Sequence, residues 1–396
     1  MVNSLHHLIE EQAEELFSKV KAIREHIHMH PELSYQENET MNFVCAKLDE
    51  IGISYQKNIA GTGIVAMVRN SKHQLSDSCI ALRCELDALP IIESNNTSYV
   101  SKNKGVMHAC GHDVHTAILL GVAEIVNRNK EFLKKPVKFI FQPGEEKNPG
   151  GASLMIEAGV LENPKVEEMY ALHVFPEMQV GKIGFKNGLY MASCDEIYIT
   201  IHGKGGHGAM PHQTIDPIMI GAQMLIGLQQ IVSRKCDPKI PCVLSFGHFE
   251  ALGATNVIPE TAHLKGTFRT MNEPWREEAL HLIETFVYST CNQFGAKAEL
   301  EISRGYPFLE NDPILTDALR SKAKVVFGDE NVEELPIRLT SEDFSFYAQQ
   351  IPVCFFRLGV RNEQKGIVHG VHHPNFDIDE EALKVGMKAM CLTVFE

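Results

Sequence analysis

Apolar residues in the first third of the chain alternate between helical and strand spacing. Residues 5–27 carry an apolar side chain every three or four positions, which predicts an amphipathic helix ending before Pro31. A second helix is predicted over residues 38–50, with Gly52 as its C-terminal cap. Short apolar runs typical of strands follow at 63–68, 80–86, 137–143 and 169–174. Strands that alternate with helices favour a mostly parallel sheet covered by helices.

The pattern changes near residue 192. An alternating strand and a Gly-rich loop come first, and the next elements predicted are a helix (216–233), two strands (242–251 and 262–270), a helix (276–294) and a strand (298–303). This β-α-β-β-α-β order is typical of a ferredoxin-like module. A helix at 313–327, a strand at 353–360 and a helix at 379–395 then restore the α/β pattern. We predict an α/β catalytic domain of residues 1–191 and 308–396, with an inserted α+β domain of residues 192–307.

Composition narrows the class of protein. With 396 residues the chain is longer than one hydrophobic core usually supports, and its formal net charge of -14 argues against nucleic acid or an anionic membrane as a partner. No apolar run is long enough for a membrane span, and the N-terminus lacks the basic and apolar segments of a signal peptide. The ten cysteines form no CxxC pair. A cytoplasmic protein with reduced cysteines is expected.

Polar groups follow several of the predicted strands. Asp87 follows the run 80–86, Glu145 and Glu146 follow the run 137–143, His173 lies near the end of the run 169–174, and His372 comes after the strand at 353–360. In open α/β sheets, ligands bind outside the carboxyl ends of the strands. We therefore expect these side chains to converge.

The stretch MHACGHDVHTA (107–117) contains donors that suit zinc or a similar transition metal. Cys110 and His112 would point to nearly opposite sides of a helix, so joint ligation requires the non-helical backbone that Gly111 permits. Asp113 is then predicted to cap the following helix. For His108 and His115, roles beside the metal ligands or on the helix surface are favoured. The alternative for the whole stretch is a buried cysteine with polar loop histidines and no metal.

Two further motifs carry polar groups in Gly-rich segments. PGEE (143–146) is predicted to open a helix, where one carboxylate can ligate a metal while its neighbour accepts a proton, although acids are also common at helix starts for electrostatic reasons. GKGGHG (203–208) matches a dinucleotide-binding pattern, but no acidic residue follows at 221–231 and the motif lies in the wrong domain. We reject the nucleotide interpretation and retain His207 as an exposed histidine facing a ligand.

Seven motifs, in the order MHACGHDVHTA, QPGEE, LHVFP, GKGGHGAMPH, TNVIPE, SEDF and VHHPNF, resemble those of dinuclear-metal aminoacylases and related carboxypeptidases. The nearest branch is that of N-acyl amino acid amidohydrolases, which includes hippurate hydrolases and auxin-conjugate hydrolases. The resemblance implies a metallopeptidase-type catalytic domain and a lid domain that also forms a homodimer. It implies these metal ligands: Cys110, His112, Glu146, His173 and His372. It further implies that Glu145 is the general base, that Asp87 orients a ligand, and that His207, Asn256 and Arg269 contact the substrate.

The chain departs from this pattern in one motif. RCELDALP has Cys84 and Glu85 where the family usually has Ala and Asp, and His373 leaves open which of His372 and His373 is the ligand.

The predicted activity is hydrolysis of the amide bond of N-acyl amino acids, with a water activated by two divalent ions (Zn, Mn, Co or Ni) and Glu145 as base. The alternatives are a dipeptidase or carboxypeptidase with the same site, or a metal-containing binding protein without catalysis. A homodimer or tetramer is expected.

Overall fold

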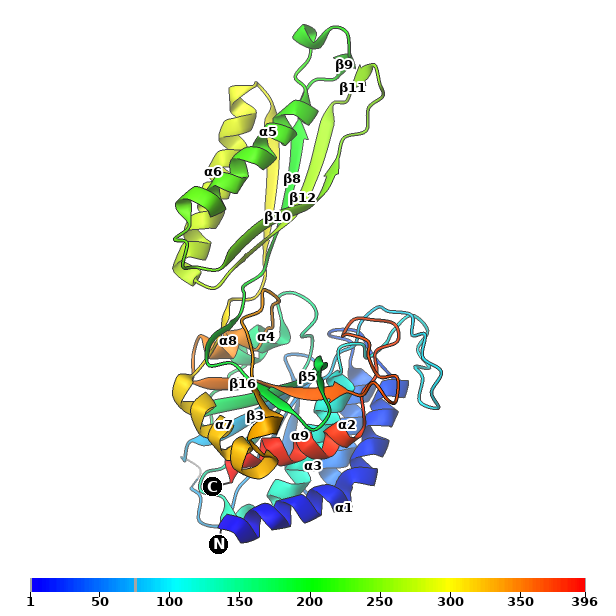
Figure 1. The fold of residues 1–396 in the computed structure, drawn as a ribbon, viewed down its shortest axis with the longest axis vertical. Helices are drawn as coiled ribbons and strands as arrows, with labels where there is room; N and C mark the ends of the chain where they lie inside the picture. Colours follow the sequence, from blue (N-terminus) through cyan, green and yellow to red (C-terminus); the bar gives the residue numbers. More distant parts are fainter. Residues whose placement is uncertain (1, 75–76, 396) are drawn as a thin grey trace. The chain divides into compact units, whose positions relative to one another are not determined.

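The chain divides into two compact units, and the polypeptide passes between them four times. The computed structural model describes residues 2–74 and 77–395. The first unit comprises Met1–Tyr190, Glu310–Ile337 and Phe346–Glu396, and the second comprises Met191–Leu309 and Arg338–Ser345. Residues 338–345 belong to the second unit, although residues 310–337 of the first unit separate them from its main segment in the sequence (Figure 1).

The first unit is built on an eight-stranded mixed sheet with the order β1-β2-β4-β3-β5-β16-β6-β15. Its strands are β1 (Tyr55–Ile59), β2 (Gly63–Val68), β3 (Cys79–Glu85), β4 (Val137–Gln142), β5 (Val166–Gln179), β6 (Ile183–Phe185), β15 (Val332–Glu334) and β16 (Val353–Arg361). The central strands β4, β3, β5 and β16 run parallel to one another. The predicted mostly parallel sheet is confirmed, and its parallel part brings four carboxyl ends to one edge.

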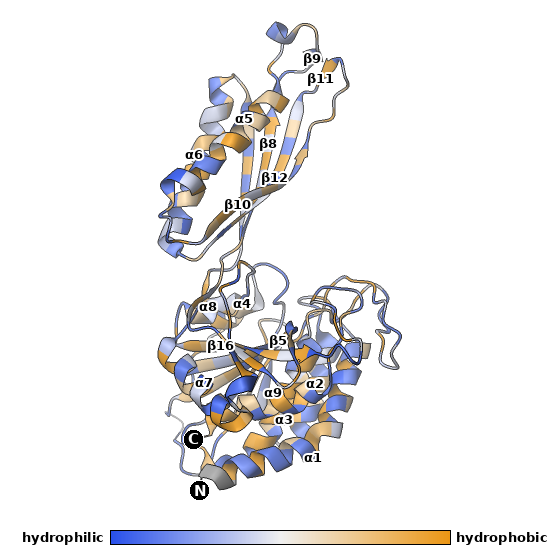
Figure 2. Cartoon of the chain, viewed as in Figure 1, coloured by the Kyte–Doolittle hydropathy of each residue, from blue (hydrophilic) through white to orange (hydrophobic). Residues whose placement is uncertain are grey.

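Helices cover this sheet because their apolar stripes face it. The helices are α1 (Val2–Met29), α2 (Asn38–Glu50), α3 (His112–Arg128), α4 (Gly151–Glu157), α7 (Pro313–Phe327), α8 (Ser345–Ala348) and α9 (Glu381–Val394). Figure 1 shows α3 and α9 against the sheet and α1 outside them. The helix α3 is buried along nearly its whole length, and Figure 2 shows hydrophilic residues alternating with hydrophobic ones along α1. Each fully buried Val, Leu or Ile of this core stabilises the fold by about 1.5–3 kcal/mol.

The second unit has the β-α-β-β-α-β order expected from its sequence pattern. Its main elements are β8 (Asp195–His202), α5 (Pro217–Gln230), β10 (Cys242–Glu250), β12 (Thr261–Thr270), α6 (Glu273–Gln293) and β13 (Lys297–Arg304). The strands form an antiparallel sheet in the order β10-β12-β8-β13, and α5 and α6 pack on it. The helix α5 begins where expected because Asp216 accepts a hydrogen bond from the backbone N–H of Ile218 (2.9 Å).

The remaining short elements lie in the connections. β9 (Gly206–His207) pairs with β11 (Val257–Ile258), and β7 (Gly188–Met191) pairs with β14 (Leu309–Asn311). Short helical turns occur at Lys130–Phe132, Pro211–Gln213, Ile231–Lys235 and Asp329–Asn331. None of the helices in the described ranges combines the length and the apolar character that a membrane span requires.

Candidate metal centre

The candidate side chains gather at the carboxyl ends of the parallel strands. Asp87 follows β3, Glu145 and Glu146 follow β4, His173 lies within β5, and His372 lies in the loop after β16. The strand β5 is longer than predicted and continues past His173 to Gln179. Because β3, β4, β5 and β16 are parallel neighbours, residues far apart in the sequence meet at one edge.

Gly111 gives the Cys110–His112 segment the geometry that joint ligation needs. Gly111 has φ +87°, a left-handed conformation, and a Cβ there would lie 2.5 Å from Cγ2 of Val174. Cys110 precedes this turn and His112 is the first residue of α3, so the two side chains avoid the opposed helical directions.

The prediction that Asp113 caps α3 is wrong. No side chain caps the N-terminus of this helix, and the Asp113 carboxylate is fully buried against Arg24 Nε (2.7 Å) and His28 Nδ1 (2.8 Å). Arg24 and His28 lie on α1, 89 and 85 residues before Asp113 in the sequence. These distant contacts outweigh the local preference of Asp113 for capping the helix. Asp113 thereby anchors the start of α3, next to His112.

His112 presents one ring nitrogen to the site. Its Nδ1 lies 2.9 Å from the backbone oxygen of Asp87, which only accepts, so Nδ1 carries the hydrogen. The buried Nε2 has no hydrogen-bond partner among the described residues. Burial lowers the pKa of His112, but the Asp87 hydrogen bond and nearby carboxylates outweigh it and raise the pKa to about 10. The position at Nε2 therefore favours a cation, either a proton or a metal ion.

His173 and Cys110 form the other side of this group. His173 Nδ1 donates to the backbone oxygen of Val174 (2.8 Å), which leaves Nε2 directed toward Cys110 Sγ at 3.4 Å. Burial lowers the pKa of His173 well below its usual value, so the ring is neutral, as a metal ligand must be. Burial and the carboxylates of Glu146 and Glu145 raise the pKa of the Cys110 thiol. A thiolate at Cys110 therefore needs a cation beside it.

Glu146 and His372 approach Cys110 from two different loops. His372 Nε2 lies 3.3 Å from Glu146 Oε1, which is buried and accepts no hydrogen bond from any residue that the structure describes. His373 instead accepts the N–H of Asn375 (3.0 Å) and stacks on His369 with 4.2 Å between ring centroids. The geometry favours His372 over His373 as the residue directed at the site.

These donors form three overlapping groups. Within each group, the ligand atoms lie within 4.8 Å of one another. The groups are Cys110–His112–His173, Cys110–Glu146–His372 and His112–Glu145–Glu146. Two groups share Cys110, and a third brings Glu145 next to two donors. Soft sulfur, imidazole and carboxylate donors together suit Zn and neighbouring transition metals. The unpartnered His112 Nε2 and Glu146 Oε1 are the atoms that such ions would satisfy.

Asp87 links three parts of the site. Its Oδ1 lies 3.2 Å from His112 Nδ1, and its Oδ2 accepts the Ser34 hydroxyl (2.7 Å) and the backbone N–H of Glu146 (2.9 Å). Burial raises the pKa of Asp87, but these hydrogen bonds, led by that of His112, outweigh it and lower the pKa. The fully buried carboxylate therefore stays ionised and fixes His112 and the PGEE loop together.

The prediction that PGEE opens a helix is wrong, because Glu145 and Glu146 lie in a loop and α4 begins only at Gly151. Two residues that the sequence analysis missed hold this loop. Tyr35 donates its hydroxyl to the Lys147 oxygen (2.6 Å), and Glu37 accepts the Gly144 N–H (2.8 Å). Both belong to the connection between α1 and α2, which carries no motif that points to a metal site.

Gly144 tests how strictly this loop is held. It has φ +57°, and a Cβ would lie 2.2 Å from the Tyr35 ring. We expect Gly144→Ala to displace the loop that carries Glu145 and to lower kcat about 10²-fold, since misplacement by 1 Å has that effect. Steady-state kinetics would measure this. Gly159→Ala is the control, since Gly159 also has positive φ (+81°) but has space for a Cβ. Equal losses in both variants would show that backbone strain, and not contact with Tyr35, is responsible.

The departure at Cys84 and Glu85 has a structural explanation for one residue only. Glu85 is buried and pairs with Arg83 and with His115 Nδ1 (2.7 Å). Cys84 Sγ lies 3.5 Å from the Thr116 hydroxyl, and it belongs to none of the donor groups found in the described chain. His108 and His115 are both buried, so the helix-surface alternative for them is wrong.

The predicted substrate-binding residues lie on the second unit. His207 and Asn256 are exposed and belong to the ribbon of β9 and β11, where the Gly208 N–H donates to the Asn256 oxygen (2.8 Å). Arg269 lies on β12, and its guanidinium contacts Thr267 Oγ1 (3.1 Å) and Ser341 Oγ (3.2 Å). The ribbon therefore brings two of the three residues close together.

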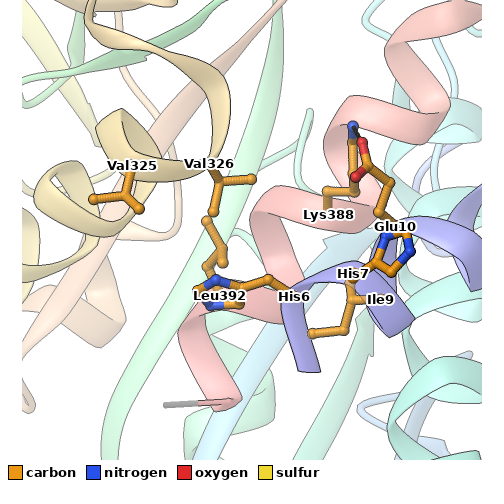
Figure 3. A pocket seen from close by; sticks show the side chains of 8 residues that line it. All are labelled: His6, His7, Ile9, Glu10, Val325, Val326, Lys388 and Leu392. Carbon is orange, nitrogen blue, oxygen red and sulfur yellow. Dashed lines mark hydrogen bonds and ion pairs between the residues drawn. The ribbon is translucent and has the colours of Figure 1, made fainter. Parts of the chain in front are cut away.

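A pocket of about 260 Å³ lies elsewhere on the first unit, between α1, α7 and α9 (Figure 3). It is lined by His6, His7, Ile9, Glu10, Val325, Val326, Lys388 and Leu392. Figure 3 shows its apolar side chains beside the imidazoles and the Lys388 ammonium. None of these residues belongs to the donor groups described above, so the pocket is separate from the candidate metal centre.

Comparisons with known proteins show what this chain is similar to in sequence and fold. A model of the family described as Peptidase family M20/M25/M40 matches residues 81–396. The N-acyl-L-amino acid amidohydrolase of Geobacillus stearothermophilus is 42% identical over 75% of this chain and 79% of its own. Thermostable carboxypeptidase 2 of Saccharolobus solfataricus is 38% identical over 93% of each chain. The crystal structure of the Bacillus subtilis YXEP protein is described as that of a dinuclear metal binding peptidase from the M20 family. It superposes on this chain with a TM-score of 0.81 at 33% identity, and the match covers 96% of this chain and 98% of that chain.

Proposed function

The chain belongs to Peptidase family M20/M25/M40, and on this premise we propose that it hydrolyses the amide bond of N-acyl amino acids with the help of two divalent metal ions. The observation that supports this most strongly is the pair of donor groups that share Cys110, one of them fully buried, with the Glu145 carboxylate beside them. A structural zinc site usually has four protein ligands and no further base nearby. The arrangement of donors favours catalysis over a structural role.

The residues proposed to hold the ions follow from the donor groups. Cys110, His112 and His173 would hold one ion, and Cys110, Glu146 and His372 the other. When bound, such ions lower the pKa of a water molecule and polarise a carbonyl oxygen. Zn, Mn, Co and Ni all suit this donor set.

Glu145 is proposed to move the proton. Its side chain is only 7% exposed, and one carboxylate oxygen lies within 4.8 Å of donor atoms of His112 and Glu146. It would accept a proton from the attacking water and return it to the leaving amine, so that the amide C–N bond breaks as the new C–O bond forms. Asp87 contributes by holding His112 and the Glu146 backbone in place.

The second unit is proposed to bind substrate and to assemble the oligomer. His207 and Asn256 lie together on the β9–β11 ribbon with side chains available to a ligand, and Arg269 supplies a guanidinium suited to a carboxylate. His207 is also proposed to stabilise the developing oxyanion. The same proposal includes a lid function for this unit and the formation of a homodimer or tetramer by it. It also includes a cytoplasmic location of the protein.

A carboxypeptidase acting on short peptides is the second candidate function. It is favoured by the 38% identity to the Saccharolobus carboxypeptidase, which covers 93% of this chain, against 75% for the Geobacillus amidohydrolase. Both reactions cleave an amide next to a free carboxylate and use the same donors. The substrate therefore distinguishes them, and the metal centre does not.

Metal removal tests the proposed function. We expect purified protein to release amine from a panel of N-acetyl amino acids, N-benzoyl amino acids and dipeptides, and to lose more than 90% of this activity, on the order of tenfold or more, after chelation. Adding back single metals should restore release with at least one of them. Release from dipeptides alone would favour the peptidase. Undiminished release from fully chelated protein would contradict a metal-dependent reaction.

A further inference from the structure

Glu85 and His115 form a buried pair behind the proposed ligand His173. Glu85 is the last residue of β3, and His115 lies in the first turn of α3. The Glu85 Oε2 atom lies 2.7 Å from His115 Nδ1, and neither side chain is more than 2% exposed. Arg83 contacts the other Glu85 oxygen and also donates to Gln142 Oε1 (3.0 Å), which holds the carboxylate from the opposite side.

The partners of His115 determine which ring nitrogen carries its hydrogen. The ionised Glu85 only accepts, because Arg83 and His115 outweigh its burial and hold its pKa well below the usual value. Nδ1 of His115 is therefore the donor. Nε2 accepts the backbone N–H of Val174 (2.9 Å), so it carries no hydrogen. Both ring nitrogens are occupied, which excludes His115 as a metal ligand in this arrangement.

The Val174 N–H belongs to the peptide group that joins it to His173. The β3–β5 ladder ends at the pair Arg83–Ala171, and beyond this point His115 takes up the N–H of Val174. The oxygen of Val174 accepts His173 Nδ1 (2.8 Å), and the His115 and His173 rings are 4.6 Å apart. His115 thus contacts the ring of His173 and also the backbone that carries it.

We propose that Glu85 and His115 are positioning residues that fix His173 so that its Nε2 atom faces the metal centre. Glu85 sets the tautomer of His115, and His115 Nε2 then holds the His173–Val174 peptide. The inference rests on the proposed function in that His173 is taken to hold one of the two ions.

Two substitutions at His115 separate the two hydrogen bonds. In His115→Gln the side-chain oxygen replaces Nε2 and still accepts the Val174 N–H. In His115→Asn the amide replaces Nδ1, which keeps the contact with Glu85 but loses the contact with Val174. The matched pair therefore differs in the bond that the proposal makes responsible for holding His173.

The measurement is the affinity of each variant for Zn²⁺, from chelator competition with counting of bound ions. We expect His115→Asn to bind one of two ions about 10–100-fold more weakly, as is usual when the group orienting a ligand is lost, and to leave the other ion unaffected. His115→Gln should stay within a few-fold of the unsubstituted protein for both ions. Equal affinities in both variants, or equal losses, would overturn the proposal. If the unsubstituted protein bound no Zn²⁺, the proposed function itself would fail, which is a different result.

A second measurement does not depend on the folding of His115→Asn. Nitrogen-15 NMR of histidine-labelled, metal-free protein reports which ring nitrogen carries the hydrogen, and the His115 signal is identified by its absence in His115→Gln. We expect a hydrogen on Nδ1 of His115 and none on Nε2. A hydrogen on Nε2 would overturn the proposal, because Nε2 could then not accept the Val174 N–H.

Discussion

Glu145→Gln is expected to lower kcat about 10²–10⁴-fold while two metal ions remain bound, because it removes a proton acceptor and no proposed ligand. Gln keeps the size of Glu145 in its nearly buried position beside His112 and Glu146, but it cannot take a proton from the attacking water. Steady-state kinetics on an N-acyl amino acid and metal content by atomic absorption would measure the two parts of this expectation.

Two control variants define what the result means. Glu157→Gln changes an exposed glutamate on α4 of the same unit and should leave kcat unchanged. Glu146→Gln alters a proposed ligand, so this variant should bind less metal than Glu145→Gln. If Glu145→Gln also lost a metal ion, the division between base and ligand would be wrong. If it kept full activity, another group would have to serve as the base.

The sequence predicted the order of elements well because the signals for it are local. Apolar periodicity identified the helices α1, α7 and α9 and the strands β3, β4 and β16 to within a few residues. Donor residues were found for the same reason, since Cys110 and His112 stand two positions apart around a glycine. A glycine in the left-handed conformation between two ligands is a requirement that can be recognised in a single short stretch.

Two of the incorrect predictions, those for Asp113 and PGEE, concern residues whose partners are distant in the sequence. A local pattern assigns Asp113 to a helix cap, but Arg24 and His28 lie in α1 and draw its carboxylate into the core. The acids of PGEE resemble a helix start, yet Glu37 and Asp87 hold the backbone N–H groups of that loop instead. A favourable charged hydrogen bond in a buried site outweighs a capping interaction, and its partner cannot be identified from neighbouring residues.

The connection between α1 and α2 was missed for a related reason. Ser34, Tyr35 and Glu37 each contact a different part of the metal centre, at Asp87, Lys147 and Gly144 respectively. None of them is a donor directed at a metal ion, so residue type alone does not reveal them. Their role becomes visible only when β3 and β4 lie side by side and the loops that follow these strands meet.

The buried pair of Arg24 and Asp113 leads to the largest expected effect on stability. Arg24→Met should lower the free energy of unfolding by about 3–5 kcal/mol, because removing one partner of a buried ion pair leaves the other charge unpaired. Arg24 donates to Asp113 Oδ2 (2.7 Å) and to Asp377 Oδ1 (2.8 Å), and the side chains of Arg24 and Asp113 are both fully buried. Urea unfolding of the full chain, followed by far-UV circular dichroism, would measure the change.

Arg128→Met is the matched control for this loss. Arg128 also contacts two carboxylates, those of Glu15 and Glu124, but it lies at the surface with 36% of its side chain exposed. Surface ion pairs contribute about 0–1 kcal/mol, so the control should change stability little. The double variant Arg24→Met/Asp113→Asn should recover part of the loss, because the unpaired carboxylate is gone. Simple addition of the two single losses would mean that the pair is not energetically coupled, and the anchoring of α3 beside His112 would then have to come from the packing of its apolar face alone.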